Sequence, residues 1–389
     1  MKTLQFIQSI SLSCLLAMGA ASCGNGENSQ PYTPLQVYFE PVRMDMNVEH
    51  LMPYFVNYPT DWAKMGLRNY PKLLTYQYHY PAWGVSGSSQ YEFLPNGRLS
   101  EQRRTSFNVG ATGFDVISYE YDNRSNLIQI KSVDDGRYKR RRKDDGFTYN
   151  SIGRLIRRDK NGQGHYDTAT FLYAYHANGA LQSILPENKN GTVNEAGVTI
   201  HKMQFDSLAH LKSFETPNTS NMFLKGINSY KLGQSVTSYT HEGHLCTQAI
   251  EKIPVKFDRG TETLTCTSSF TYNSHGDLAT WTYNGGVYKS KGNSWRVDDM
   301  KFTISYEYVY DEKGNWTQAT ITFPANIDDI PALRTYYKAT KNGFTSNQDR
   351  SSAVKPGETP SLTISRSIDY WDEKTVASEK ENKKNWDVK

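Results

Sequence analysis

One short unit recurs eight times along this chain and constrains the fold more than any other feature. Each copy has an aromatic residue, three intervening residues, a small residue, one further residue, and then Leu or Trp. The aromatic residues of successive copies lie 26 to 38 residues apart. Such recurrence indicates a repeat architecture in which each unit packs mainly against its neighbours. The copies are Phe93, Gly97, Leu99; Tyr121, Ser125, Leu127; Tyr149, Gly153, Leu155; Tyr175, Gly179, Leu181; Phe205, Ala209, Leu211; Tyr239, Gly243, Leu245; Tyr272, Gly276, Leu278; and Tyr310, Gly314, Trp316.

Each unit has the pattern of a β-hairpin. In the copy at Tyr149 the residue two positions earlier is also aromatic, and period two places both on one face of a strand. Polar turn residues follow, and Gly153 permits a positive φ. Leu155 then opens the return strand, where it can pack against the aromatic residue. We expect the copies with Ser125 and Ala209 in place of Gly to have more strained or differently shaped turns.

Further turn signals lie between the units, so each repeat contributes about two strands. They are Asp134–Gly136, Lys160–Gly162, Asn190–Gly191, Asp258–Gly260 and Asn284–Gly286. The predicted fold is all-β: a long antiparallel meander of hairpin repeats that forms one large twisted or curled sheet. The 27 Tyr and 16 Phe residues agree with strands and argue against general disorder. Closure into a barrel depends on strand tilt and shear, which the pattern leaves open.

The units resemble the YD repeats of the Rhs family, which carry a Tyr-Asp…Gly-Arg-Leu core. The matching segments are residues 93–99, 149–155 and 310–316, and the resemblance covers roughly residues 88–325. The chain is also similar to bacterial lipoproteins with YD-like repeats, which often end in a strand like Ile364–Trp371. The resemblance implies hairpin architecture and an extracytoplasmic location. It does not imply toxin encapsulation, because the spacing here is longer and the protease-like core of the toxin shells is missing.

The N-terminus has the three parts of a secretory signal. Met1–Lys2 is positively charged, Leu4–Ala21 is largely apolar, and small residues precede Cys23. A Cys at this place resembles a bacterial lipobox, although Ala20 stands where Leu is usual. The resemblance implies lipidation of Cys23 and anchoring to the outer membrane of a Gram-negative bacterium. The alternative is an ordinary secreted protein, and periplasmic or surface exposure stays open.

These signals divide the chain into six parts. An interruption of the repeat pattern at Asn218–Gly233 is interpreted as a loop insertion within the array. The parts are a signal peptide (1–22), a flexible tether (23–34), an N-terminal cap of the sheet (35–87), the hairpin array (88–325), a C-terminal loop with the final strand (326–372) and a charged tail (373–389).

The charges are nearly balanced, with 44 basic and 40 acidic residues. This balance argues against wholesale nucleic-acid binding. One basic run is a candidate site for a polyanion: Arg137, Lys139, Arg140, Arg141, Arg142 and Lys143. The alternative is a solvated hairpin, because flanking aspartates can neutralise the run across the strands.

Two tryptophans outside the repeat positions, Trp281 and Trp295, are candidates for stacking on sugar rings; the alternative is a place in the core.

His241, His244 and Cys246 are metal-ligand types, but no second ligand cluster is evident, so we expect a polar hairpin tip and no metal or other cofactor. A turn at residues 258–260 sets Cys266 opposite about residue 252. That is roughly 20 Å from Cys246 along the strand, which argues against a disulfide. An extracytoplasmic compartment would permit one, so the pairing stays open.

Signatures of enzymes are missing from the sequence: there is no His-Glu-x-x-His, Gly-x-Ser-x-Gly or Gly-Lys-Ser/Thr phosphate loop. We therefore expect a non-catalytic envelope lipoprotein that acts as a binding or scaffolding module for a protein or glycan partner, of undetermined oligomeric state. The alternatives are a glycan-active hydrolase or lyase, and a polyanion-binding module that uses the basic hairpin.

Overall fold

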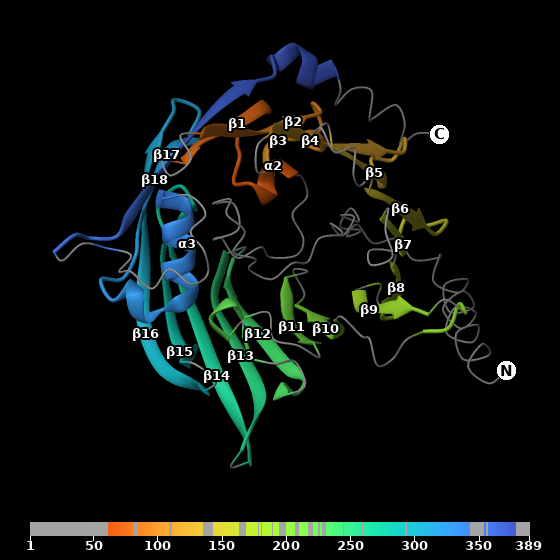
Figure 1. Cartoon of the computed structure of the whole chain (residues 1–389). Helices are drawn as coiled ribbons and strands as arrows, with labels where there is room; N and C mark the ends of the chain where they lie inside the picture. Colours follow the sequence, from red (N-terminus) through yellow and green to blue (C-terminus); the bar gives the residue numbers. More distant parts are fainter. Residues whose placement is uncertain are drawn as a thin grey trace.

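The chain folds into one curled sheet that forms a ring in Figure 1. This computed structural model describes residues 61–378 with gaps at 81–84, 109–110, 135–142, 163–168, 178, 180, 189, 194–199, 207–209, 217–220, 225, 228–230, 244, 259, 292–293, 343–353 and 355–356. Within these residues, eighteen strands belong to the sheet and every pairing is antiparallel. The prediction of an all-β antiparallel meander is confirmed.

The elements follow one another with short connections. The strands are β1 (Pro71–Tyr80), β2 (Val85–Phe93), β3 (Leu99–Asn108), β4 (Ala111–Tyr121), β5 (Leu127–Asp134), β6 (Lys143–Tyr149), β7 (Leu155–Gly162), β8 (Ala169–Tyr175), β9 (Leu181–Glu187), β10 (His201–Phe205), β11 (Leu211–Thr216), β12 (Ser235–Glu242), β13 (Leu245–Phe257), β14 (Gly260–Tyr272), β15 (Leu278–Lys291), β16 (Ser294–Tyr310), β17 (Trp316–Thr322) and β18 (Ser361–Tyr370). The helices are α2 (Asp61–Lys64), α3 (Pro331–Asn342) and the 3₁₀ turns η4 (Met222–Leu224) and η6 (Ile327–Asp329).

The sheet closes almost completely into a barrel. Each strand pairs with its successor from β1 to β9 and again from β10 to β18. The first and last strands also pair, with Tyr76 of β1 opposite Arg366 of β18. Between β9 and β10 the described residues make one bridge, where the Ile184 amide donates to the Ile200 carbonyl at 2.9 Å. The seam of the barrel therefore lies between β9 and β10.

Most side chains that point into the barrel are apolar, and most that point out are polar. On β18, Leu362 and Ile364 are buried while Thr363 between them is exposed, as period two requires. Helices α2 and α3 lie inside the ring (Figure 1), where Leu333 and Tyr337 of α3 are fully buried. The inward-facing side chains and these helices together form the hydrophobic core.

The interruption at Asn218–Gly233 contributes to that core, so its interpretation as a loop insertion was incomplete. All three residues of η4 are buried. The Phe223 ring lies 4.3 Å from the Tyr283 ring and 5.1 Å from the Phe302 ring, centroid to centroid. The insertion therefore fills barrel interior beside β15 and β16.

Two of the predicted turns are wrong. Lys160–Gly162 lies within β7, where it pairs with Lys143–Asp145 of β6. Asn284–Gly286 lies within β15, which continues along β16. There the two glycines permit close approach: a Cβ on the first would lie 2.8 Å from the Cα of Cys266, and a Cβ on the second 2.6 Å from Cγ1 of Val297. Gly in a strand can thus mark close packing as well as a turn.

Candidate functional site: the repeat-turn rim

Five of the eight repeat turns share one local geometry. In the third unit, Tyr149 lies opposite Leu155 after a bulge. The Asn150 side-chain oxygen accepts a hydrogen bond from the Arg154 amide at 2.8 Å, and Gly153 has a φ of 79°. This is an Asx turn, in which a short polar side chain replaces main-chain partners. Equivalent side-chain acceptors are Asp122, Asp206, Asn273 and Asp311.

The structure brings the predicted repeat residues together in seven of the eight units. In these units the aromatic residue is the cross-strand partner of the Leu or Trp, and the pairs are Phe93 and Leu99, Tyr121 and Leu127, Tyr149 and Leu155, Tyr175 and Leu181, Phe205 and Leu211, Tyr272 and Leu278, and Tyr310 and Trp316. The positive φ predicted for Gly is present at Gly97, Gly153, Gly179, Gly243, Gly276 and Gly314. Ser125 also has a φ of 62°, and Ala209 lies outside the described residues.

The unit at Tyr239 is different. Tyr239 pairs with Ala249, and the strand continues to Glu242, which pairs with Leu245 around a turn that contains Gly243. The hairpin is therefore tighter than in the other copies. Cys246 is buried at the place that Leu takes elsewhere.

A hydroxyl group joins successive repeats, which the sequence interpretation missed. A Tyr side chain of one unit donates to a main-chain carbonyl at the start of the preceding unit's return strand, at 2.5 to 2.9 Å. The pairs are Tyr121 to Leu99, Tyr149 to Leu127, Tyr175 to Leu155, Tyr272 to Cys246, and Tyr308 to Leu278. The recurrence of Tyr rather than Phe was the available signal, because a buried hydroxyl needs a partner.

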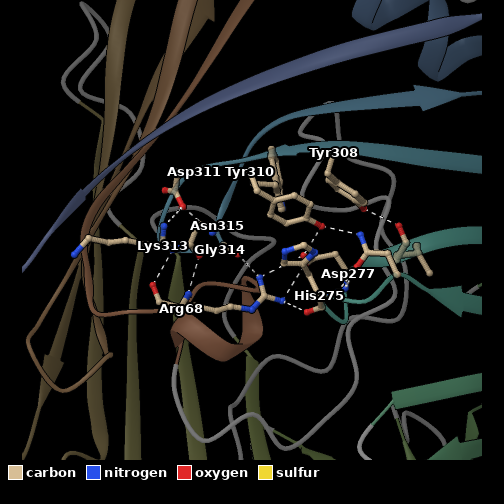
Figure 2. Close-up of polar contacts among 12 residues, drawn as sticks. Arg68, His275, Asp277, Tyr308, Tyr310, Asp311, Lys313, Gly314 and Asn315 are labelled. Carbon is tan, nitrogen blue, oxygen red and sulfur yellow. Dashed lines mark hydrogen bonds and ion pairs between the residues drawn. The ribbon is translucent and has the colours of Figure 1, made fainter.

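We call the edge of the barrel formed by the repeat turns the rim. At one side of the rim, the segment before β1 binds two repeat turns (Figure 2). The Arg68 guanidinium donates to both Asp277 oxygens, at 3.3 and 3.4 Å, and to the Gly314 carbonyl at 2.9 Å. It also donates to the His275 carbonyl. The Arg68 amide donates to Asn315 Oδ1 at 2.8 Å. We call this group of contacts the Arg68 latch; it connects the N-terminal segment to the β14–β15 and β16–β17 hairpins.

The second half of the rim network centres on Asn315, which is fully buried. Its side-chain nitrogen lies 2.8 Å from both the Arg68 carbonyl and the Tyr370 hydroxyl. Tyr370 in turn donates to Asp311, and the Lys313 ammonium lies 4.6 Å from the centroid of the Tyr370 ring. These contacts tie the last strand, β18, to the same turn.

Tyr310 completes the network beside Asp277. Its hydroxyl donates to Asp277 Oδ2 at 2.9 Å and accepts from Asn273 at 2.7 Å, while the His275 ring stacks on the Tyr310 ring at 3.9 Å. Burial raises the Tyr310 pKa to about 12. The polar groups of the rim are thus directed at one another, an arrangement that holds the structure together.

The outer surface of β14–β18 carries a different feature, a field of Ser and Thr side chains that we call the hydroxyl face. Thr282 lies opposite Thr303 and their hydroxyls are 2.9 Å apart. Thr320 lies opposite Thr363 on one side and Glu307 on the other. The members are Thr267, Ser269, Thr271, Thr280, Thr282, Thr303, Ser305, Thr320, Thr322, Ser361, Thr363 and Ser365.

Ion pairs lie on other strands of the barrel and also near the β15–β16 turn, where Lys289 and Arg296 flank Asp298. Arg157 of β7 lies 2.9 Å from Glu187 of β9, and Lys202 of β10 lies 3.0 Å from Glu215 of β11. The preference of Thr for exposed strands would act on all strands equally. It therefore does not by itself account for the gathering of hydroxyls on β14–β18.

Several predicted site residues lie outside the described residues or have no described side chain. Cys23 precedes the described part of the chain. The basic residues Arg137, Lys139, Arg140, Arg141 and Arg142 lie in the gap at residues 135–142. Lys143 begins β6, but its side chain is not described.

The two candidate tryptophans pack against the protein itself. Trp281 is 3% exposed and belongs to the core, beside Phe223 and Phe270, so it offers no face to a sugar. Trp295 is half-buried: its ring stacks against Phe257 at 5.5 Å, and the Lys231 ammonium lies 5.0 Å from its centroid. Its faces are used within the fold.

Cys246 and Cys266 are free and buried, and Cys266 lies opposite Glu251, one residue from the expected place. The His241 ring stacks on the His210 ring at 5.0 Å, and His244 is not described. In the part of the chain that the structure describes, no three His, Cys, Asp or Glu side chains form a metal-binding group. No helix there is long and apolar enough to cross a membrane.

Comparisons with known proteins gave only weak structural similarities. No protein-family profile and no curated protein matches this sequence. Among solved structures, a porin-like protein from Bacteroides uniformis is 10% identical over 77% of this chain and 96% of its own, with a TM-score of 0.34. The TcdB2-TccC3 complex without its hypervariable C-terminal region is 12% identical over 72% of this chain and 15% of its own, with a TM-score of 0.28.

Proposed function

We propose that this protein is a non-catalytic lipoprotein of the outer membrane that binds a neutral glycan on its hydroxyl face. The hydroxyl face is the observation that supports this function best. Hydroxyl groups both donate and accept hydrogen bonds, and thus match the hydroxyls of a sugar. A surface with few charges favours a neutral partner over an ionic one.

The described carboxyl groups with displaced pKa values include no candidate for a general acid. A general acid at neutral pH needs a raised carboxyl pKa. Among the described residues, the carboxyl pKa values that are clearly displaced are all lowered. Hydrogen bonds from Arg157 and Thr170 hold down the pKa of Asp159 against its partial burial, and Lys289 and Arg296 do the same for Asp298. Asp372 is the third such group, held by hydrogen bonds from Thr375.

The lipid anchor rests on the sequence around Cys23. Cells that express the full chain should incorporate labelled palmitate into the protein, and the protein should sediment with outer membranes. Cys23→Ser should abolish both. Labelling that persists in this variant would contradict the anchor at Cys23.

Glycan binding is tested with the full chain by affinity electrophoresis in gels that contain neutral polysaccharides. Thr282→Lys and Thr320→Lys place charges within the hydroxyl face and should reduce retardation at least tenfold. Val236→Lys is the matched control, because Val236 is exposed on β12 outside the face and should leave binding unchanged. Equal loss in all three variants would contradict the proposed surface.

The same preparations separate the other functions that the sequence left open. Release of reducing ends or unsaturated sugars from a polysaccharide would replace the proposal with a glycan hydrolase or lyase. Binding that falls steeply with salt, and that is lost in Arg140→Ala with Arg142→Ala, would favour the polyanion module instead.

A further inference from the structure

Arg366 of β18 is a buried cation with unused hydrogen-bond donors. Its side chain points into the barrel and the residue is 4% exposed. Nε donates to the Trp316 carbonyl at 2.5 Å, and the guanidinium carbon lies 3.5 Å from the centroid of the Trp316 ring. Nη1 and Nη2 are shielded from solvent and have no hydrogen-bond partner. Buried charged donors without acceptors are rare, because leaving them unpaired costs free energy.

A second unpartnered donor lies two strands away in the same cross-strand row. Arg366 is opposite Tyr76 of β1, and Tyr76 is opposite Ser89 of β2. All three are buried, so their side chains face the interior together. The Ser89 hydroxyl is buried and has no hydrogen-bond partner. The row therefore presents a guanidinium and a hydroxyl on either side of one aromatic ring.

A second arginine that faces the interior has the acidic partner that Arg366 lacks. Arg158 of β7 lies on the inner face, where its Nη2 is 2.5 Å from Asp145 Oδ2. Arg68, at the rim, has Asp277. For Arg366, no Asp or Glu in the described part of the chain lies within ion-pairing distance. Burial lowers the pKa of its guanidinium, and the nearby Tyr76 hydroxyl and Asp277 carboxylate oppose this effect only in part.

We propose that Arg366 and Ser89 bind a small oxyanion, a carboxylate or phosphate group, inside the barrel. The two Nη nitrogens form a planar fork that matches two oxygens of either group. The Ser89 hydroxyl supplies a further donor, and the Trp316 and Tyr76 rings enclose the site. This site is separate from the hydroxyl face, so it stands whether or not that face binds glycans.

Entry requires movement of neighbouring side chains, because the donor atoms are covered. Binding should therefore be slow, with an observed rate that levels off as ligand concentration rises. Non-specific effects of an added salt act at the surface and are complete on mixing. The time course thus distinguishes the interior site from a general salt effect.

The test uses the full chain, with inorganic phosphate exchanged for chloride at constant ionic strength. Tryptophan fluorescence should change slowly and saturably, since the guanidinium lies against Trp316. Arg366→Met should abolish the change, and Arg366→Lys should weaken binding at least tenfold because a single ammonium lacks the fork. Arg296→Met is the control: Arg296 is exposed on β16, and this variant should respond as the native protein does.

Parallel titrations identify the source of the oxyanion. Glucuronate binding without phosphate binding assigns the site to a sugar carboxylate, the reverse assigns it to a phosphate, and glucose should give no signal. An absent or instantaneous response to both anions overturns the proposal, as does an equal response in Arg366→Met. Should that variant not fold, the saturation and slow kinetics of the native protein decide the matter alone.

Discussion

Removal of the Arg68 side chain should destabilise the whole barrel, although Arg68 lies before the first strand. Arg68→Ala removes donors to Asp277, Gly314 and His275 at once. The Asp277 side chain is 8% exposed, so its carboxylate would lose its cation in a poorly solvated place. The Tyr310 hydroxyl would remain as its donor.

The expected loss is about 2 kcal/mol in the free energy of unfolding. Removing one partner of a fully buried ion pair costs about 3–5 kcal/mol. The Arg68 side chain is 33% exposed, which admits water and brings the cost toward the ~1.5–3 kcal/mol of a charged hydrogen bond. Asn69 and Tyr70 both have a φ of 60°, and release of the segment would return about 1 kcal/mol of that backbone strain.

Urea unfolding of the full chain, followed by tryptophan fluorescence, measures this loss. Lys202→Ala is the control, since Lys202 is 67% exposed in its pair with Glu215 and should have no resolvable effect. Combining Arg68→Ala with Asp277→Asn should cost at least about 1 kcal/mol less than the sum of the single losses. An Arg68→Ala loss below about 0.5 kcal/mol would refute the latch, because surface substitutions are usually within that range.

Three further experiments test the repeats and the interior. Tyr149→Phe removes the hydroxyl that donates to the Leu127 carbonyl and should cost about 1 kcal/mol in urea unfolding. Gly153→Ala should cost about 1–2 kcal/mol because φ is 79°, whereas Gly146→Ala, with an ordinary φ and open space around its Cβ, should be nearly neutral. Burial raises the Cys246 pKa to about 12, so at pH 8 a disulfide reagent should modify this thiol at least about 100-fold more slowly in the folded than in the urea-unfolded protein.

The hairpins were predictable because their causes are local. An aromatic residue and a Leu six positions later must meet across a short turn once the turn residues set the bend. The Asx acceptor and the positive φ lie within the same few residues, as at Asn150 and Gly153. The seven regular units follow this rule, and the copy at Tyr239 departs from it where Gly243 permits a tighter turn.

Closure and the rim network were not predictable, because their partners lie far apart in the chain. Arg68 and Asn315 are separated by 247 positions, and no local pattern marks either as the other's partner. The same holds for β1 and β18, whose pairing joins the two ends of the array. Glycine patterns also have two physical causes, a turn or a close approach, and at Asn284–Gly286 the second prevails.

Closure changes how the array should unfold. In an open meander each hairpin contacts its neighbours, so the ends fray first and stability is nearly a sum over units. Here both ends are held, since β1 pairs with β18 and the Arg68 latch binds turns of β14–β17. The seam is instead internal to the sequence, at β9 and β10, where the Ile184–Ile200 bridge joins the edges. Hydrogen exchange should therefore be fastest at β9–β10 and slow at β1 and β18, which is the reverse of the order expected for an open sheet.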